Sequence, residues 1–345
     1  MQQKKFLGIC GRRRSGKDTL ARILSLHFAS CRVLHFASPI KGISFLDLHE
    51  AAAFVPYVSD EGRQVLQGLG VGLYDHHSDG ELVWVNLLRA VASFIPERNI
   101  IIGDVRMVHE ERAIRRWGGV IVKVESDTPP TPAADSQLDF HRSEVEVDAV
   151  SPDYSISSGT LRQLLLAGDV VQILEKVVLP IADVAGWVGD LLAPPRRPAI
   201  YISSNIMARH KDFAQHFEQV AEILREEGFV PISPVEMEDG VKDYDFLLDA
   251  VRSEGMVRGC SRLVSLDLKR IKEADGILCV FKTPSIGVAM EALLGVLQGK
   301  PVVVVCEDML TLFHPWLWAL TQGNVYHTLP AAIKRLKFLF GLGGG

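Results

Sequence analysis

The first segment whose residues could do chemistry is Gly-Ile-Cys-Gly-Arg-Arg-Arg-Ser-Gly-Lys-Asp-Thr, residues 8–19. Its glycines and lysine have the spacing of a phosphate-binding loop, Gly11-x4-Gly16-Lys17. Glycine lets the backbone wrap phosphate groups, a helix start adds positive potential, and the lysine reaches the β- and γ-phosphates. The alternative is an ordinary glycine-rich turn between a strand and a helix. The residues predicted to bind ATP are Gly11, Ser15, Gly16, Lys17, Asp18 and Thr19.

A second segment ends in an acidic residue that could bind magnesium. Residues 99–104 read Asn-Ile-Ile-Ile-Gly-Asp, an apolar strand that ends in an acid able to bind Mg²⁺ or its water shell. Thr19 or Asp18 would be its partner, because the Ser/Thr that usually follows the lysine is Asp18 here. Arg106 follows at the same strand end, where an arginine can bind phosphate bidentately. Alternatively, Asp104 and Arg106 form a structural pair.

The third segment is Thr283-Pro-Ser-Ile-Gly-Val-Ala-Met-Glu291, between a strand and a helix. Ser285 is a plausible N-cap, and Gly287 permits close approach of a ligand. Glu291 would lie in the first two helical turns, where a carboxylate could attack an anomeric carbon while Asp267 protonates the leaving base. The alternative is that Glu291 is a partly exposed helix residue and Asp267 an N-cap.

Alternating strands and helices must position these residues. This pattern predicts an α/β protein with parallel sheets in both halves of the chain. The predicted strands are Lys5–Cys10, Asn99–Ile102, Val120–Val124, Ala199–Ser203, Phe229–Ile232, Gly276–Phe281 and Pro301–Cys306. The predicted helices are Thr19–Phe28, Glu110–Trp117, Phe213–Glu227 and Val288–Leu297.

The chain of 345 residues is long enough for two domains. Its proline-rich segment Ala193-Pro-Pro-Arg-Arg-Pro198 indicates a linker. We therefore predict a first domain over 1–185, a linker over 186–198 and a second domain over 199–345. The two tryptophans Trp316 and Trp318 are expected in a core or an interface.

Composition restricts the partners. The net charge of −5 gives no global field for nucleic acid or an anionic membrane, so small anionic substrates would need local basic sites. Five cysteines without a CxxC pair indicate reduced, buried thiols. No signal peptide and no run of 18 uncharged apolar residues are recognised, so we expect a cytoplasmic protein that neither binds nor crosses a membrane.

The first half resembles the bacteriophage-type deoxynucleoside monophosphate kinases, a P-loop family. The resemblance covers about residues 5–178. It implies transfer of the ATP γ-phosphate to a deoxynucleoside monophosphate, with Lys17 as a catalytic residue, Lys41 and Arg106 as acceptor ligands, and Mg²⁺ as cofactor held by Thr19 and Asp104. The motifs are GRRRSGKDT, Ala37-Ser-Pro-Ile-Lys41, Arg63-x-x-Leu-Gln-x-x-Gly70, Trp84, Gly103-Asp-Val-Arg106, His141-x-Ser-Glu144 and Asp153-Tyr154.

The second half resembles the nucleoside 2-deoxyribosyltransferase superfamily, most closely its 2′-deoxynucleoside 5′-monophosphate N-hydrolase branch. The resemblance covers about residues 198–336. It implies a Rossmann-like domain, an oligomer of at least a dimer formed through this domain, Glu291 as nucleophile and Asp267 as acid/base. The implied substrate-binding residues are Tyr201, Ser203, Asn205, Ile206, Ser285 and Gly287, with Arg209 as a phosphate ligand. The motifs are Tyr201-Ile-Ser-Ser-Asn-Ile206, Asp267-x7-Asp275, Pro284-Ser-x-Gly-x-x-x-Glu291 and Gly299-Lys-Pro301.

Together the two resemblances imply a bifunctional enzyme that phosphorylates one deoxynucleotide and hydrolyses the N-glycosidic bond of another. Two alternatives remain: the second domain exchanges bases instead of hydrolysing, or the kinase-like domain is an inactive regulatory unit.

Overall fold

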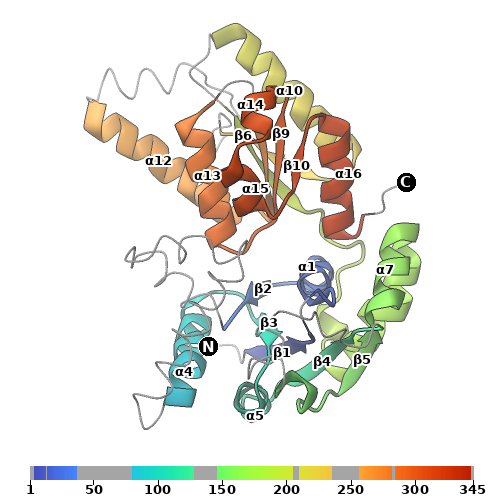
Figure 1. The fold of residues 1–345 in the computed structure, drawn as a ribbon. Helices are drawn as coiled ribbons and strands as arrows, with labels where there is room; N and C mark the ends of the chain where they lie inside the picture. Colours follow the sequence, from blue (N-terminus) through green and yellow to red (C-terminus); the bar gives the residue numbers. More distant parts are fainter. Residues whose placement is uncertain are drawn as a thin grey trace, which may run out of the picture. The chain divides into compact units, whose positions relative to one another are not determined.

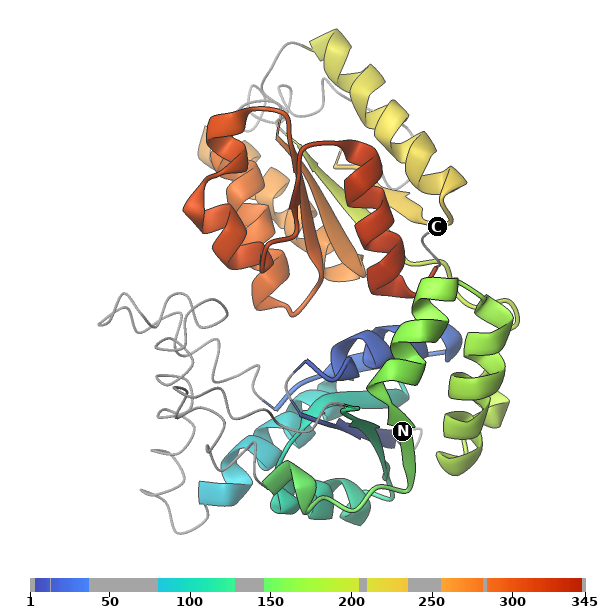
Figure 2. The same ribbon diagram turned by 45° about the vertical axis from the view of Figure 1, so that its right-hand side comes forward.

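The chain packs into two compact α/β units. The first comprises Met1–Arg196 with Phe338–Gly345, and the second comprises Arg197–Lys337. The structure is a computed structural model that describes residues 4–12, 14–36, 80–127, 146–204, 210–234, 256–281 and 284–342. Each unit contains one five-stranded sheet of parallel strands with helices on its two faces (Figures 1 and 2). The α/β class predicted from the sequence is confirmed.

The sheet of the first unit has the strand order β2-β3-β1-β4-β5. In register, Leu7 pairs with Ile101 on one side and with Val120 on the other. Every residue of β3 is buried, as expected for a central strand covered on both faces. The strands are β1 (Lys5–Cys10), β2 (Cys31–Leu34), β3 (Asn99–Val105), β4 (Val120–Glu125) and β5 (Tyr154–Ser157).

Helices cover the two faces of this sheet with separate apolar clusters. One face packs against α1 (Lys17–His27), α7 (Ser158–Ala167) and α9 (Leu179–Val184), with Leu24, Leu161 and Ile181 in its core. The short α8 (Val170–Ile173) and a π-helical turn at Leu174–Val178 join α7 to α9. The other face packs against α4 (Gly80–Phe94) and α5 (Val108–Arg116), whose Leu88 and Ile114 are buried.

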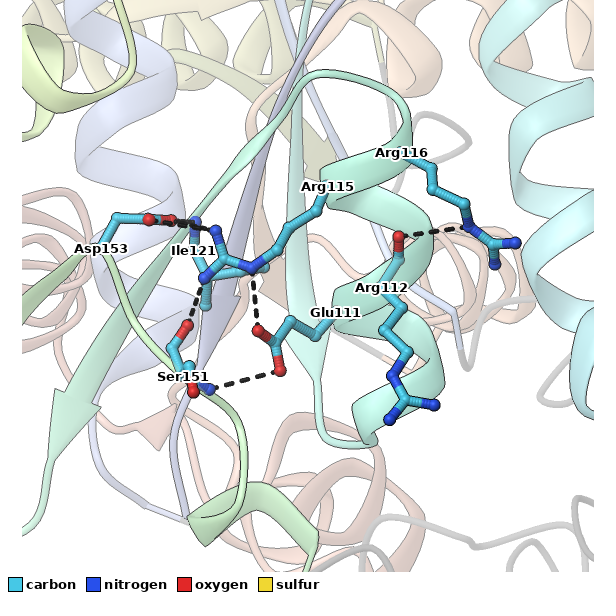
Figure 3. A network of polar contacts seen from close by, with 7 residues as sticks. All are labelled: Glu111, Arg112, Arg115, Arg116, Ile121, Ser151 and Asp153. Atoms are coloured by element: carbon cyan, nitrogen blue, oxygen red, sulfur yellow. Dashed lines mark hydrogen bonds and ion pairs between the residues drawn. The ribbon is translucent and has the colours of Figure 1, made fainter.

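A polar network on the surface fixes α5 to the sheet (Figure 3). Arg115 pairs with Glu111 at 2.8 Å and with both carboxylate oxygens of Asp153 at 3.0 Å. Asp153 in turn accepts a 2.7 Å hydrogen bond from the backbone N–H of Ile121 on β4. Arg115 also donates to the carbonyl oxygen of Ser151. Asp153 therefore joins α5, β4 and the start of β5.

Most of the expected linker is bound to the first unit. The buried carboxylate of Asp190 pairs with Lys5 at 2.8 Å and with Arg98. The backbone N–H groups of Leu192 and Arg196 donate to carbonyl groups at the end of α1, both at 2.8 Å. The boundary between the two units accordingly falls after Arg196.

The sheet of the second unit has the order β10-β9-β8-β6-β7. Tyr201 on β6 pairs in register with Ile277 on β8 and with Ile232 on β7. The strands are β6 (Ala199–Ser204), β7 (Val230–Ile232), β8 (Gly276–Phe281), β9 (Val302–Cys306) and β10 (Val325–Tyr326). The helices are α10 (His210–Glu226), α12 (Met256–Glu273), α13 (Ile286–Leu297), α14 (Met309–Leu312), α15 (Pro315–Thr321) and α16 (Leu329–Phe340).

One face of the second sheet positions the candidate site. Residues of α12, α13 and α15 pack there into one cluster with the strands, including Ile271, Ala292 and Leu317. Figure 1 shows α12, α13 and α15 on this side, with α10 and α16 on the other. Trp316 and Trp318 of α15 are 50% and 43% exposed, so they do not lie in the core, and the interface that was the other expectation stays a prediction.

Two further expectations concern the surface. All five cysteines are free, but Cys260 is exposed and Cys31 half-buried, so uniform burial is wrong; Cys10, Cys279 and Cys306 are buried as predicted. Within the described ranges, none of the helices combines the length and apolar character needed to cross a membrane.

Candidate active sites

In the second unit, the direction of the chain connections reverses between the neighbouring strands β6 and β8. These neighbours are connected in opposite directions, since β6 leads to β7 at one edge and β8 leads to β9 on the other side. In open α/β sheets, ligands bind outside the carboxyl ends of strands at such a reversal. Tyr201 and Ser203 lie near this end of β6, and α13 begins shortly after β8.

The two hydroxyl groups of β6 hold the carboxylate of Glu291. Tyr201 donates a 3.1 Å hydrogen bond to Oε1, and the Ser203 hydroxyl donates to Oε2. Both residues are fully buried and, being two apart on a strand, face the same side of the sheet. Ser285 is the N-cap of α13, accepting from the N–H of Val288, so this prediction is confirmed. Glu291 lies in the second turn, as predicted.

Burial controls the protonation of Glu291. The pKa of its carboxyl group is raised to about 7, chiefly by removal from water and in part by the charge of the nearby Asp267 carboxylate. The hydrogen bonds from Ser203 and Tyr201 act in the opposite sense, because they favour the ionised form. Glu291 therefore exchanges its proton near neutral pH, which suits a group that alternates between attack and release.

Asp267 is the second carboxyl group of this site. It lies well inside α12, so the alternative that it is an N-cap is wrong. Burial raises its pKa, whereas the charge of Arg270 and the nearby Tyr201 hydroxyl lower it. Arg270 Nη1 lies 3.6 Å from Asp267 Oδ1. The charges of both Asp267 and Glu291 also raise the pKa of the Tyr201 hydroxyl, so this hydroxyl lies close to the two acids.

Lys300 fixes the helix that carries Asp267. Its ammonium group donates to the carbonyl oxygens of Lys272 at 2.7 Å and Ala274 at 2.6 Å, and also to that of Ile271. Carbonyl groups at a helix end have no helical partner, and a cation there also complements the helix dipole. Lys300 therefore ties the end of α12 to the segment that precedes β9.

The remaining predicted residues of this site divide into two groups. At Gly287, a side-chain Cβ would meet Ser285 Oγ at 3.9 Å and no closer described atom, so space is open beside the backbone. Asn205, Ile206 and Arg209 lie outside the described residues.

The first unit has a comparable position at the carboxyl ends of β1 and β3. The loop after β1 leads into α1, and Gly16 at the helix start has φ 97°, a left-handed conformation that favours glycine. At Gly11, a Cβ would lie 2.6 Å from the Val124 carbonyl oxygen, so only glycine fits. Ser15 is buried and its Oγ has no hydrogen-bond partner among the described residues, while Lys17 is 6% exposed. A buried lysine and a buried hydroxyl of this kind are the features expected of a loop that binds a polar ligand.

Two oxygen-bearing residues near this loop suit a magnesium ion. Asp104 Oδ1 accepts a 2.7 Å hydrogen bond from the backbone N–H of Phe36, which orients its carboxylate at the end of β3. Thr19 lies in the first turn of α1 and accepts a 3.3 Å hydrogen bond from Arg22, which leaves an oxygen lone pair. Mg²⁺ takes few protein oxygens and keeps water ligands, so this donor set fits it. Asp18 is exposed.

A buried acid fixes the backbone around Arg106. Glu110 accepts hydrogen bonds from the backbone N–H groups of Arg106 at 2.8 Å and Met107 at 3.0 Å, which caps α5. Burial raises the pKa of Glu110 to about 8, and the charge of Asp104 adds to this. Arg106 itself is half-buried at the end of β3. Lys41, the other predicted acceptor ligand, lies outside the described residues.

Sequence reasoning missed the roles of Arg270 and Glu110. A basic residue three positions after Asp267 on a helix lies on the same face, so the spacing gave a usable signal for Arg270. Glu110 stands three residues after the helix N-cap, the spacing of a capping box. Neither spacing reveals that these two side chains are largely buried.

No model of a known protein family matches the chain, and no curated protein matches it. What the two units can do is therefore inferred from the geometry of their own residues.

Proposed function

We propose that the second unit cleaves the N-glycosidic bond of a 2′-deoxynucleoside 5′-monophosphate. The observation that carries the proposal is the Glu291 carboxylate, held by Tyr201 and Ser203 at the strand ends where α/β sheets bind ligands. A carboxylate with both oxygens anchored is a fixed nucleophile, and Asp267 supplies the second carboxyl group that the reaction requires.

The proposed reaction has two steps. In the first, an ionised Glu291 oxygen bonds to the sugar C1′ while the bond from C1′ to the base nitrogen breaks. Protonated Asp267 gives its proton to the departing base. In the second, Asp267 takes a proton from water, whose oxygen replaces Glu291 at C1′ and releases 2-deoxyribose 5-phosphate. Ser285 and Gly287 at the start of α13, with Asn205, Ile206 and Arg209, are the proposed substrate ligands.

Base exchange is the alternative for this unit. If a second base, rather than water, attacks the glycosyl ester, the reaction is a deoxyribosyl transfer with the same two carboxyl groups. Incubation of the protein with a deoxynucleotide and no acceptor base separates the two reactions. Free sugar phosphate identifies the hydrolase, whereas base release that requires an added base identifies the transferase.

We further propose that the first unit transfers the ATP γ-phosphate to a deoxynucleoside monophosphate. The observation in favour is the loop after β1, in which only glycine fits at position 11 and the buried Ser15 hydroxyl has no partner among the described residues. Lys17 would stabilise the transferred phosphoryl group. Bound Mg²⁺, held by Thr19 and Asp104, would neutralise phosphate charge. Arg106 and Lys41 would hold the acceptor.

The units would then compete for deoxynucleotides unless their base preferences differ. One arrangement is that the hydrolase removes an unwanted nucleotide while the kinase phosphorylates a wanted or modified one. Equal base selectivity of Lys17→Ala and Glu291→Gln variants, each retaining one activity, would count against it. If Lys17→Ala leaves phosphoryl transfer unchanged, the kinase assignment fails, and a regulatory role for this unit takes its place.

We propose that the second unit also mediates self-association into at least a dimer. Helices α12 and α13 contact each other, and each exposes a pair of large apolar side chains one turn apart. Isolated apolar side chains are ordinary on surfaces, but a group beside a candidate site suits a protein interface. The exposed residues are Val264, Leu268, Ile286 and Met290, with Phe313 and Trp316 near α15.

A panel of deoxynucleoside monophosphates, incubated with and without ATP, tests both activities in one experiment. Chromatography resolves diphosphates from free bases. We expect base release without ATP that Glu291→Gln abolishes, and diphosphate formation with ATP that Lys17→Ala abolishes. A panel in which neither product appears with any base would contradict the proposed function.

A further inference from the structure

The further inference concerns Arg270 and rests on the proposed function of the second unit. Arg270 follows Asp267 by three positions on α12, so the two side chains share one helix face. Its guanidinium side chain is 13% exposed, and Nη1 lies 3.6 Å from Asp267 Oδ1. The same nitrogen donates to the carbonyl oxygen of Pro234, which follows β7. Arg270 thus joins the second carboxyl group of the site to the carboxyl end of a neighbouring strand.

Among the described residues, three titratable or charged groups face Asp267. From its own helix it faces Arg270, from β6 the Tyr201 hydroxyl, and from α13 the Glu291 carboxyl group. Arg270 and Tyr201 favour the ionised form of Asp267. Glu291 has two hydroxyl donors, and no arginine of the described ranges acts on its carboxyl group. The positive charge therefore stands on the Asp267 side of the pair.

We propose that Arg270 is a positioning residue that orients the Asp267 carboxylate and determines which of the two carboxyl groups carries their shared proton. It was not among the residues expected from the sequence. With Arg270 in place, Asp267 is ionised in the empty site and the proton resides on Glu291. The nucleophile is thereby kept protonated until substrate enters, and the proton must pass to Asp267 before the base can leave.

The direction of the effect on pH dependence follows from charge alone. A cation near two interacting acids lowers the apparent pKa values of the pair, because it favours the states with fewer protons. Replacing Arg270 by methionine removes that charge and raises both apparent values. Replacing it by lysine keeps a positive charge on the same helix face, although the hydrogen bond from the guanidinium group to the Pro234 carbonyl oxygen is lost.

The test is the pH profile of kcat/KM for base release by the full-length protein. We expect Arg270→Met to move both limbs of the profile to higher pH, by about one unit. Arg270→Lys should restore most of that shift. If the Arg270→Met profile superimposes on that of the wild type after scaling, the assignment of Arg270 is wrong, even though the proposed hydrolysis stands.

A second experiment measures the titration of Asp267 without requiring catalysis. Carbon-13 NMR of the side-chain carboxyl groups, with Asp267 assigned through Asp267→Asn, gives the titration of Asp267 directly. Asp267 should titrate at higher pH in Arg270→Met than in the wild type. An unchanged titration overturns the proposal whether or not the protein releases a base, so failure of this inference and failure of the proposed function remain distinguishable.

Discussion

The Tyr201 hydroxyl donates a 3.1 Å hydrogen bond to Oε1 of Glu291, and it does so from a side chain that is completely buried in β6. The strand fixes the hydroxyl, and α13 brings the carboxylate to it from 90 positions further along the chain. The buried Tyr201 hydroxyl and the half-buried Glu291 carboxylate both give up water, and their hydrogen bond offsets part of that cost.

Loss of this hydrogen bond should be visible in catalysis. In Tyr201→Phe, Ser203 still holds Oε2, but Oε1 has lost its donor. A hydrogen bond to a charged group contributes about 1.5–3 kcal/mol, so kcat/KM for base release should fall by roughly 10- to 100-fold. The acid limb of the pH profile should also move to higher pH, because the lost donor favoured ionised Glu291. Tyr326→Phe on β10 is the matched control; equal profiles for both variants would show that Tyr201 does not act on Glu291.

The raised pKa of Glu291 has a consequence for stability. A carboxyl group with a pKa of about 7 in the folded state and 4.5 as its ordinary value contributes stability that is complete below pH 4.5. That contribution is lost as the pH rises through 7, and its size is at most about 3 kcal/mol. Glu291→Gln cannot ionise and should keep it. The variant should therefore gain stability over the wild type at pH 8 relative to pH 5.

Hydrogen exchange of amides in β6 and β8 measures this stability for the second unit. The exposed Glu226 provides the control, and Glu226→Gln should follow the wild type at both pH values. If Glu291→Gln shows the same difference from the wild type at pH 5 and pH 8, the Glu291 carboxyl group is not held in a low-dielectric position.

The proposed phosphate-binding loop can be tested at Gly11, where the structure leaves no space for a side chain. In Gly11→Ala, the new methyl group would lie 2.6 Å from the Val124 carbonyl oxygen and 2.7 Å from Ser15 Oγ, at φ 152°. The loop must deform, so we expect at least a 10-fold loss of ATP affinity. We also expect a fall of about 1–3 kcal/mol in unfolding free energy. At Gly189, a Cβ meets no described atom within 4 Å, so Gly189→Ala is the control. Equal ATP affinity for the two variants, measured by calorimetry, would contradict a phosphate-binding loop.

Self-association should depend on the exposed apolar side chains of α13. Ile286 is 85% exposed, so Ile286→Glu has no cost in the folded unit itself. A charge placed in a protein interface is unfavourable, and we expect the variant to sediment as a smaller species than the wild type. Phe94→Glu changes an 88% exposed residue of the first unit and should sediment like the wild type. A wild type that sediments as a monomer at every concentration would exclude the proposed interface.

The sequence predicted the strands that are marked by a continuous run of apolar residues. Runs such as Gly276–Phe281 are continuous and apolar, as buried parallel strands are, and β8 has these same bounds. The short edge strands β2 and β10 have no such run and were not predicted. Helix α12 was also missed, and the Lys300 ammonium group that caps its end comes from a segment further along the chain.

The candidate site was predictable only in part. The spacing from Ser285 to Glu291 fixes an N-cap and a carboxylate on one helix, which is local information. That Tyr201 and Ser203 contact Glu291 depends on the pairing of β6 with β8, a relationship between distant segments. The influence of Arg270 on Asp267 was visible as a spacing, but its strength depends on burial that a sequence does not display.

The most direct measurement is a search for the covalent intermediate. A deoxynucleoside monophosphate with fluorine at C2′ slows both steps, so the sugar phosphate should accumulate as an ester on the protein. After proteolysis, mass spectrometry should find the added fluorodeoxyribose phosphate on the peptide that contains Glu291, and none in Glu291→Gln. Base release by Glu291→Gln at the wild-type rate, or a label on another residue, would contradict the account.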